Sequence, residues 1–133
     1  MSISEFFERL GAPLHNIVWS WGAVAEDETV ILRCWAHEVR KVNGKYQYIV
    51  LDDAYSKRAG GYSERVRHLQ RIKDGAKIRL VIVTDVDPKN PQGQIRDFKS
   101  DALMIGDNIF MEGEKTYVEC DGIEKLTNGR RNV

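Results

Sequence analysis

Hydrophobic residues near the N-terminus recur at intervals of three and four, which is the spacing of an α-helix. Residues 2–5 have the form of a capping box, which predicts that this helix begins at about Ile3. Gly11 and Pro13 follow the last apolar position and should end the helix. Its apolar stripe would consist of Ile3, Phe6, Phe7 and Leu10.

From residue 17 the hydrophobic spacing changes to two, which predicts strands at about 17–25, 29–42 and 45–51. Asn43-Gly44 lies between the last two runs and favours a type I′ hairpin turn. Such a turn places Val42 opposite Lys45, provided that no bulge interrupts the strand. One face of the hairpin would then carry Trp35, His37, Val39, Tyr46 and Tyr48.

A second helix is predicted from about Tyr62 or Ser63 to Lys73, with Gly75 after its end. Residues 80–83 are apolar without alternation, as in a central strand that is covered on both faces. Runs at about 94–99, 102–106, 108–113 and 115–120 predict shorter strands after it. The buried stripe of the second helix would consist of Tyr62, Val66, Leu69 and Ile72.

These elements predict an α+β fold with a strongly bent antiparallel or mixed sheet and two short helices. The single compact domain would span residues 1–121, and residues 122–133 would form a mobile tail. A bent sheet with short helices and aromatic strand residues resembles the PUA-like group of small nucleic-acid-binding barrels, which includes modified-base readers. The resemblance implies a partly closed, PUA-like barrel that binds nucleic acid.

The composition is that of a globular protein, with 42% hydrophobic and 30% charged residues. Cys34 and Cys120 are too few for a disulfide framework or a zinc site, which favours a reducing compartment. The polar N-terminus does not match a secretion signal, and no apolar stretch approaches the ~20 residues that span a bilayer. We therefore expect a cytoplasmic protein that does not enter a membrane.

The net charge of zero conceals an uneven distribution of charge along the chain. Residues 57–79 contain eight basic and two acidic side chains, whereas residues 85–124 contain four basic and ten acidic ones. A local basic excess attracts phosphates, and the arginine fork suits them well. The alternative is a solvated helix face that pairs with the acidic half of the molecule. The candidate phosphate contacts are Lys57, Arg58, Arg65, Arg67, Arg71 and Lys73.

All three tryptophans, Trp19, Trp21 and Trp35, lie within seventeen consecutive positions. Tryptophans on strands commonly fill a core, but they also stack on flipped or single-stranded nucleobases. Trp35, with Tyr46 and Tyr48, is the better candidate for a stacking surface. Trp19 and Trp21 would either join that surface or pack in the core.

One arrangement suggests an enzyme. Asp85 ends the central strand, and Asp97 and Lys99 follow on the next strand. This spacing resembles that of restriction-type nucleases, and the resemblance implies Mg²⁺ ligands at Asp85 and Asp97 and a catalytic lysine at Lys99. The sequence departs from that family because it has no upstream helix with a catalytic glutamate. The three histidines show no metal-ligand spacing.

The leading hypothesis is a small, non-catalytic nucleic-acid-binding module without a cofactor or a metal ion. The basic helix would hold phosphates, and the strand aromatics would stack on a base. The Mg²⁺-dependent nuclease is the first alternative. The second is a protein-interaction or structural subunit, in which the basic and acidic halves pair between protomers of a homo-oligomer.

Overall fold

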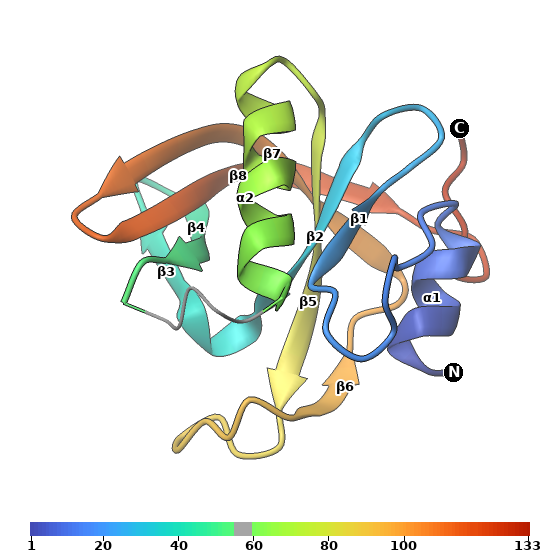
Figure 1. Cartoon of the computed structure of the whole chain (residues 1–133), viewed down its shortest axis with the longest axis horizontal. Coiled ribbons are helices and arrows are strands. Elements are labelled where there is room, and N and C mark those ends of the chain that lie inside the picture. Colours follow the sequence, from blue (N-terminus) through green and yellow to red (C-terminus); the bar gives the residue numbers. More distant parts are fainter. Residues whose placement is uncertain (55–59) are drawn as a thin grey trace.

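The computed structural model describes residues 1–54 and 60–133. Lys57 and Arg58, two of the candidate phosphate contacts, lie outside the described residues. Within the described residues the chain forms two α-helices, α1 (Ile3–Arg9) and α2 (Gly60–Lys73), and one 3-10 helix, η1 (Ala36–Glu38). The strands are β1 (Gly22–Val24), β2 (Val30–Trp35), β3 (Val39–Val42), β4 (Lys45–Asp52), β5 (Ile78–Asp85), β6 (Ile95–Phe98), β7 (Ala102–Glu112) and β8 (Lys115–Lys125) (Figure 1).

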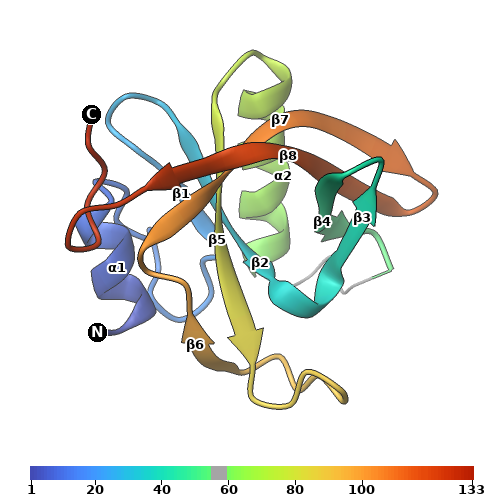
Figure 2. The ribbon, with the colours of Figure 1, turned by 180° about the vertical axis from the view of Figure 1, so that it is seen from behind.

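The strands form one mixed, eight-stranded sheet in the order β1-β2-β5-β7-β8-β4-β3, with β6 paired to the end of β5. β2 and β5 run parallel, and the other described pairs are antiparallel. The predicted α+β class with two short helices is thereby confirmed. The described strands do not close into a barrel, because β1 and β3 end the order without pairing with each other. The sheet bends, however, so that β4 contacts β2, and α2 lies against both strands (Figure 1, Figure 2).

Two clusters of buried side chains cover opposite faces of the central strands. Val30, Leu32 and Cys34 of β2 belong to the first cluster, with Leu69 and Ile72 of α2. In the second cluster, Ile31 of β2 and Val81 of β5 pack on Phe6 and Phe7 of α1 and Ala23 of β1. Alternate residues of a strand point to opposite faces, so the unbroken apolar run at 80–83 was correctly predicted to be covered on both sides.

The hairpin register was predicted correctly, but the long second strand was not. Val42 pairs with Lys45 and Val39 with Tyr48, and Asn43 has the positive φ of 51° that the tight turn requires. The predicted strand 29–42 is broken by η1, because residues 36–38 form a 3-10 turn between β2 and β3. The alternation therefore does not continue from Trp35 through η1 to the hairpin.

Helix α2 begins earlier than predicted, and its buried face agrees only in part with the predicted stripe. Leu69 and Ile72 are buried as predicted, but Glu64, Arg65 and His68 are buried too, whereas Val66 is 44% exposed. The difference arises because hydrophobicity alone assigned the charged side chains to solvent. The helix instead begins at Gly60, where two glycines leave room for tryptophan rings.

The C-terminal residues continue the fold where the sequence predicted a mobile tail. Strand β8 runs to Lys125, and Arg131 bonds to both Glu124 and Asp27 at side-chain distances of 2.9 and 3.3 Å. The Arg131 side chain is only 5% exposed. No helix among the described residues is long and apolar enough to cross a membrane.

Candidate functional site

A cavity of about 450 Å³ lies where the ends of β2 and β5 meet η1, β4 and the first half of α2. The loop between β5 and β6 forms part of its wall through Pro91 and Gly93. Its volume is within the range of about 300–1,000 Å³ that is usual for small-molecule sites. The side chains used below, Trp21, Arg33, Trp35, His37, Glu38 and Arg65, all line this cavity.

The tryptophans are held at the start of α2 by close contact with glycine backbone. A Cβ atom on Gly61 would lie 2.2 Å from Cε2 of Trp21, and one on Gly60 would lie 3.0 Å from the Trp19 ring. Trp35 lies on the other side of β2 from the first core cluster and packs at a tilt on His37, with ring centroids 5.6 Å apart. All three indoles are half-buried, and Trp21 and Trp35 line the cavity. The tryptophans therefore combine a structural role with access to a ligand-sized space.

The segment before β1 folds into a hydrogen-bonded turn, although the sequence predicted a strand from residue 17. The Asn16 side chain accepts the N–H of Val18 at 2.8 Å, which bends the backbone away from an extended conformation. Ser20 Oγ accepts the N–H of Asn16 at 3.0 Å and donates to Glu64 of α2 at 3.1 Å. These bonds fix the backbone on which the side chains of Trp19 and Trp21 stand.

Arg65 connects β2 and β4, which contact each other without pairing, and the residue before β1. Its Nη2 donates to the carbonyl oxygens of Trp21 and Arg33, at 2.8 and 2.9 Å, and its Nη1 donates to the carbonyl of Val50 in β4. The side chain is 3% exposed, and burial lowers its pKa, although the nearby Cys34, Glu64 and Glu38 oppose that shift. Arg65 was predicted to hold a phosphate, but its donors instead face backbone carbonyls inside the protein.

Two further polar side chains, those of Arg33 and Glu38, line the cavity. Burial, together with the charge of Arg65, lowers the pKa of Arg33 to about 10. Burial also raises the pKa of the Glu38 carboxyl, and the neighbouring Asp52 raises it further against the effect of His37. No hydrogen bond or ion pair joins either side chain to another of the residues that the structure describes. The cavity therefore offers a strong donor and an acceptor to a ligand.

Asp85 organises the loop that forms the cavity wall. Its side chain is fully buried, and its carboxylate accepts the N–H groups of Asp87, Gln92 and Gly93 at 2.9, 3.0 and 2.8 Å. Burial alone would raise the pKa of Asp85, but these hydrogen bonds outweigh burial and hold it below its usual value. The carboxylate is thus engaged by backbone.

The structure separates the residues of the nuclease arrangement. Asp97 pairs with Thr84 across β5 and β6, and its exposed carboxylate approaches Arg96 at 3.6 Å. Lys99 lies 3.9 Å from Asp101. Asp85 lines the main cavity, whereas Asp97 lines a second hollow beside the N-terminus. The described residues contain no group of three potential metal-binding side chains.

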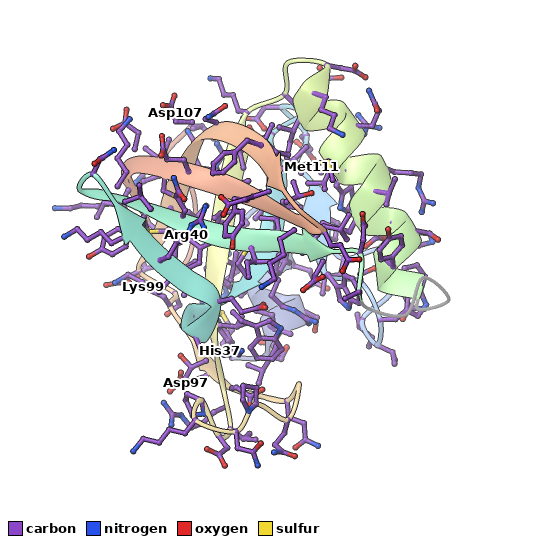
Figure 3. All side chains as sticks on the ribbon, turned by 90° about the vertical axis from the view of Figure 1, so that its left-hand side faces the viewer. His37, Arg40, Asp97, Lys99, Asp107 and Met111 are labelled. Carbon is purple, nitrogen blue, oxygen red and sulfur yellow. The ribbon has the colours of Figure 1, made fainter. Side chains whose placement is uncertain are left out.

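The predicted stacking surface is also divided. Trp35 lines the cavity, but Tyr48 is 8% exposed within the first core cluster, where burial raises its pKa to about 12. Tyr46 is 45% exposed on the β4 hairpin strand, with Lys41 Nζ 5.3 Å from its ring centroid. Figure 3 views this side of the molecule, with Arg40 on β3 and Met111 on β7. The rings that line the cavity with Trp35 are those of Trp21 and His37, and none of the described lining residues is a tyrosine.

Of the predicted phosphate contacts within the described residues, Arg67, Arg71 and Lys73 have exposed side chains on α2. Sequence reasoning did not single out Arg33 or Glu38. The sequence did contain one indication of a special role for Arg33, which is the one charged residue within the apolar run of residues 30–35. A charge inside such a strand is costly to bury unless it has a partner, a ligand or access to water.

No protein-family model, curated protein or solved structure matches this chain. The functional argument therefore rests on the cavity and on the charges around it.

Proposed function

We propose that this protein is a small, non-catalytic nucleic-acid-binding module that holds one unstacked base in the cavity. The observation that carries the proposal is a space of about 450 Å³ lined by Trp21, Trp35 and the guanidinium of Arg33, which has no hydrogen-bond partner among the described residues. A nucleobase has flat faces that stack on aromatic rings and a polar edge that requires hydrogen bonds. The indoles and the guanidinium supply these two kinds of contact within one cavity.

The exposed basic residues of α2 support contacts to the nucleic-acid backbone. Arg67, Arg71 and Lys73 extend over about 9 Å of the helix axis, at a rise of about 1.5 Å per residue. Arg65, at the cavity wall, belongs to the same helix. A strand with one base in the cavity would therefore bring neighbouring phosphates toward the helix. Lys57 and Arg58, which precede α2 in the sequence, remain part of this proposal.

The proposal extends to the fold. The approach of β4 to β2, with Arg65 bonded to both, supports a partly closed barrel of the PUA-like type. In such an arrangement α2 would fill the opening that strand pairing leaves. Nucleic-acid binding would then use the end of the barrel where the cavity lies.

Binding of fluorescein-labelled single-stranded and duplex DNA and RNA, measured by anisotropy at two salt concentrations, tests the proposal. We expect affinity to fall steeply with salt, because neutralised phosphates release counterions. Arg67→Ala with Arg71→Ala should weaken binding to all sequences alike and reduce the salt dependence. Arg9→Ala, which changes an exposed arginine of α1, is the matched control. Unchanged binding by the double variant would remove α2 from the interface.

Tryptophan emission tests the cavity separately. Wild-type emission should be quenched on binding, and Trp35→Phe should reduce both quenching and affinity, since one stacked base contributes about 1–3 kcal/mol. Trp19→Phe is the control, because Trp19 packs on Gly60 and is not among the residues that line the cavity. Equal quenching in both variants, or no binding at low salt, would contradict the proposal.

A further inference from the structure

Arg33 is the exception among the arginines that the structure describes as buried or half-buried. Arg40, Arg65, Arg79 and Arg131 each donate to carboxylates, amides or backbone carbonyls within the protein. Arg33 is half-buried and lines the cavity, and no described residue accepts a hydrogen bond from its guanidinium. Because Arg33 is only half-buried, its guanidinium can reach a ligand that enters the cavity.

Glu38 is the corresponding exception among the carboxylates. Every other aspartate or glutamate that the structure describes as less than exposed accepts at least one hydrogen bond: Asp52 from Ala54, Asp53 from Tyr62, Glu64 from Ser20, Asp85 from its loop, Glu119 from Gln47 and Glu124 from Arg79. Glu38 lines the same cavity as Arg33, and no ion pair joins the two side chains. The cavity thus holds a donor and an acceptor that have no partner within residues 1–54 and 60–133.

We infer that the cavity selects a base that carries both an amino group and a ring carbonyl, namely cytosine or guanine. Arg33 would donate to the carbonyl oxygen, and the Glu38 carboxylate would accept from the amino group, while Trp21 and Trp35 contact the ring faces. Thymine and uracil have no amino group for Glu38, and their one free ring N–H lies between two carbonyls, which would face the carboxylate oxygens unfavourably. Adenine has no carbonyl for Arg33. This inference rests on the proposed function and names the ligand class of the same cavity.

Competition between oligonucleotides tests the inference. The probes are single-stranded thirteen-nucleotide strands of otherwise abasic spacer, with one central cytosine, guanine, adenine or thymine, at about 100 mM salt. Each correct polar pair discriminates by about 5- to 150-fold, so cytosine or guanine should compete at least 5-fold better than thymine or adenine. Arg33→Met should lower the affinity for the preferred base, because the thioether cannot donate a hydrogen bond.

A change of preference separates recognition from a structural effect. In Glu38→Gln the side-chain amide can donate to a carbonyl, so this variant should lose affinity for cytosine or guanine and gain affinity for thymine. Glu26→Gln, an exposed change in the turn before β2, is the matched control and should leave the preference unchanged. Circular dichroism and the melting temperature establish that each variant is folded.

The outcomes distinguish this inference from the proposed function. Equal competition by all four bases, or a Glu38→Gln variant with the wild-type preference, would overturn the selectivity while the binding module stands. No competition by any probe, together with no binding of longer strands, would overturn the proposed function itself.

Discussion

Arg65→Met provides the sharpest test of the fold, because the sequence and the structure assign opposite roles to this side chain. A surface arginine that holds phosphates should contribute little to stability, and surface substitutions usually change the free energy of unfolding by less than about 0.5 kcal/mol. The structure instead buries Arg65 and directs its guanidinium at three backbone carbonyls.

The magnitude follows from the carbonyls that the substitution would leave without a donor. The Trp21 carbonyl also accepts the N–H of Arg33 at 2.8 Å, so it keeps one partner. The carbonyls of Val50 and Arg33 would lose the hydrogen bonds from Arg65, at about 1–3 kcal/mol each for an unsatisfied buried group. Methionine is easier to bury than a guanidinium, which offsets part of that loss. We expect Arg65→Met to lower the free energy of unfolding by about 2–4 kcal/mol.

Urea denaturation followed by tryptophan emission measures this difference. With a typical slope of about 1–3 kcal/mol per molar urea, the midpoint should fall by about 1–2 M. The control is Arg67→Met, because Arg67 lies two residues further along the same helix and its side chain is exposed. Its free energy of unfolding should remain within about 0.5 kcal/mol of the wild-type value. Equal midpoints for the two variants would refute the buried role of Arg65.

Three further predictions concern single positions. Gly61→Ala should lower the melting temperature by several degrees, because the new Cβ would lie 2.2 Å from the Trp21 ring. Helix propensity alone would favour alanine by about 1 kcal/mol, so an increase in the melting temperature would show that the ring can move away. Burial and three nearby arginines lower the pKa of His68 to about 4, so between about pH 6.5 and 4 only the unfolded chain takes up this proton. Stability should therefore decrease across that window as the pH falls, by up to about 3 kcal/mol, and urea titrations of His68→Gln should show a flatter dependence. Asp85 has a lowered pKa in the folded protein, so its stabilising effect is present above about pH 4 and is lost as the pH falls through the folded value. Asp85→Asn should lose about 2–4 kcal/mol at pH 7, and this loss should shrink as acid protonates the wild-type carboxylate; a loss that stays constant until the wild type unfolds in acid would contradict the ionised role.

Features that depend on neighbouring residues were predictable from the sequence. The capped first helix has Ser2 accepting the N–H of Glu5 at 3.1 Å, as the capping box implied. The Asn43-Gly44 turn defined the register of β3 and β4, because both residues adopt positive φ. The apolar run at 80–83 identified the central strand. In each case the residues that decide the structure lie within a few positions of one another.

Features decided by distant contacts were not predictable. The parallel pairing of β2 with β5 joins segments that are far apart in the sequence. Trp35 and Tyr48 were predicted to share one face because η1 was not recognised. The short 3-10 turn has no characteristic hydrophobic spacing from which it could have been predicted. Arg65 was assigned to solvent because its carbonyl partners come from three separate segments. The cavity also depends on those segments, so neither Glu38 nor Trp21 could be assigned to it from spacing.

Arg65 also connects the stability of the fold to the proposed binding site. Two of the carbonyls that it binds belong to Trp21 and Arg33, whose side chains line the cavity. Arg65→Met should therefore weaken binding of a single-stranded probe even at a temperature where the variant is fully folded. A direct phosphate contact would also reduce the slope of log affinity against log salt by about 0.7 for a single strand, whereas a positioning residue leaves that slope unchanged. Weaker binding with the wild-type slope would support positioning by Arg65, with Arg67→Met as the variant that reduces the slope. A reduced slope in Arg65→Met would instead show that the Arg65 guanidinium contacts a phosphate directly.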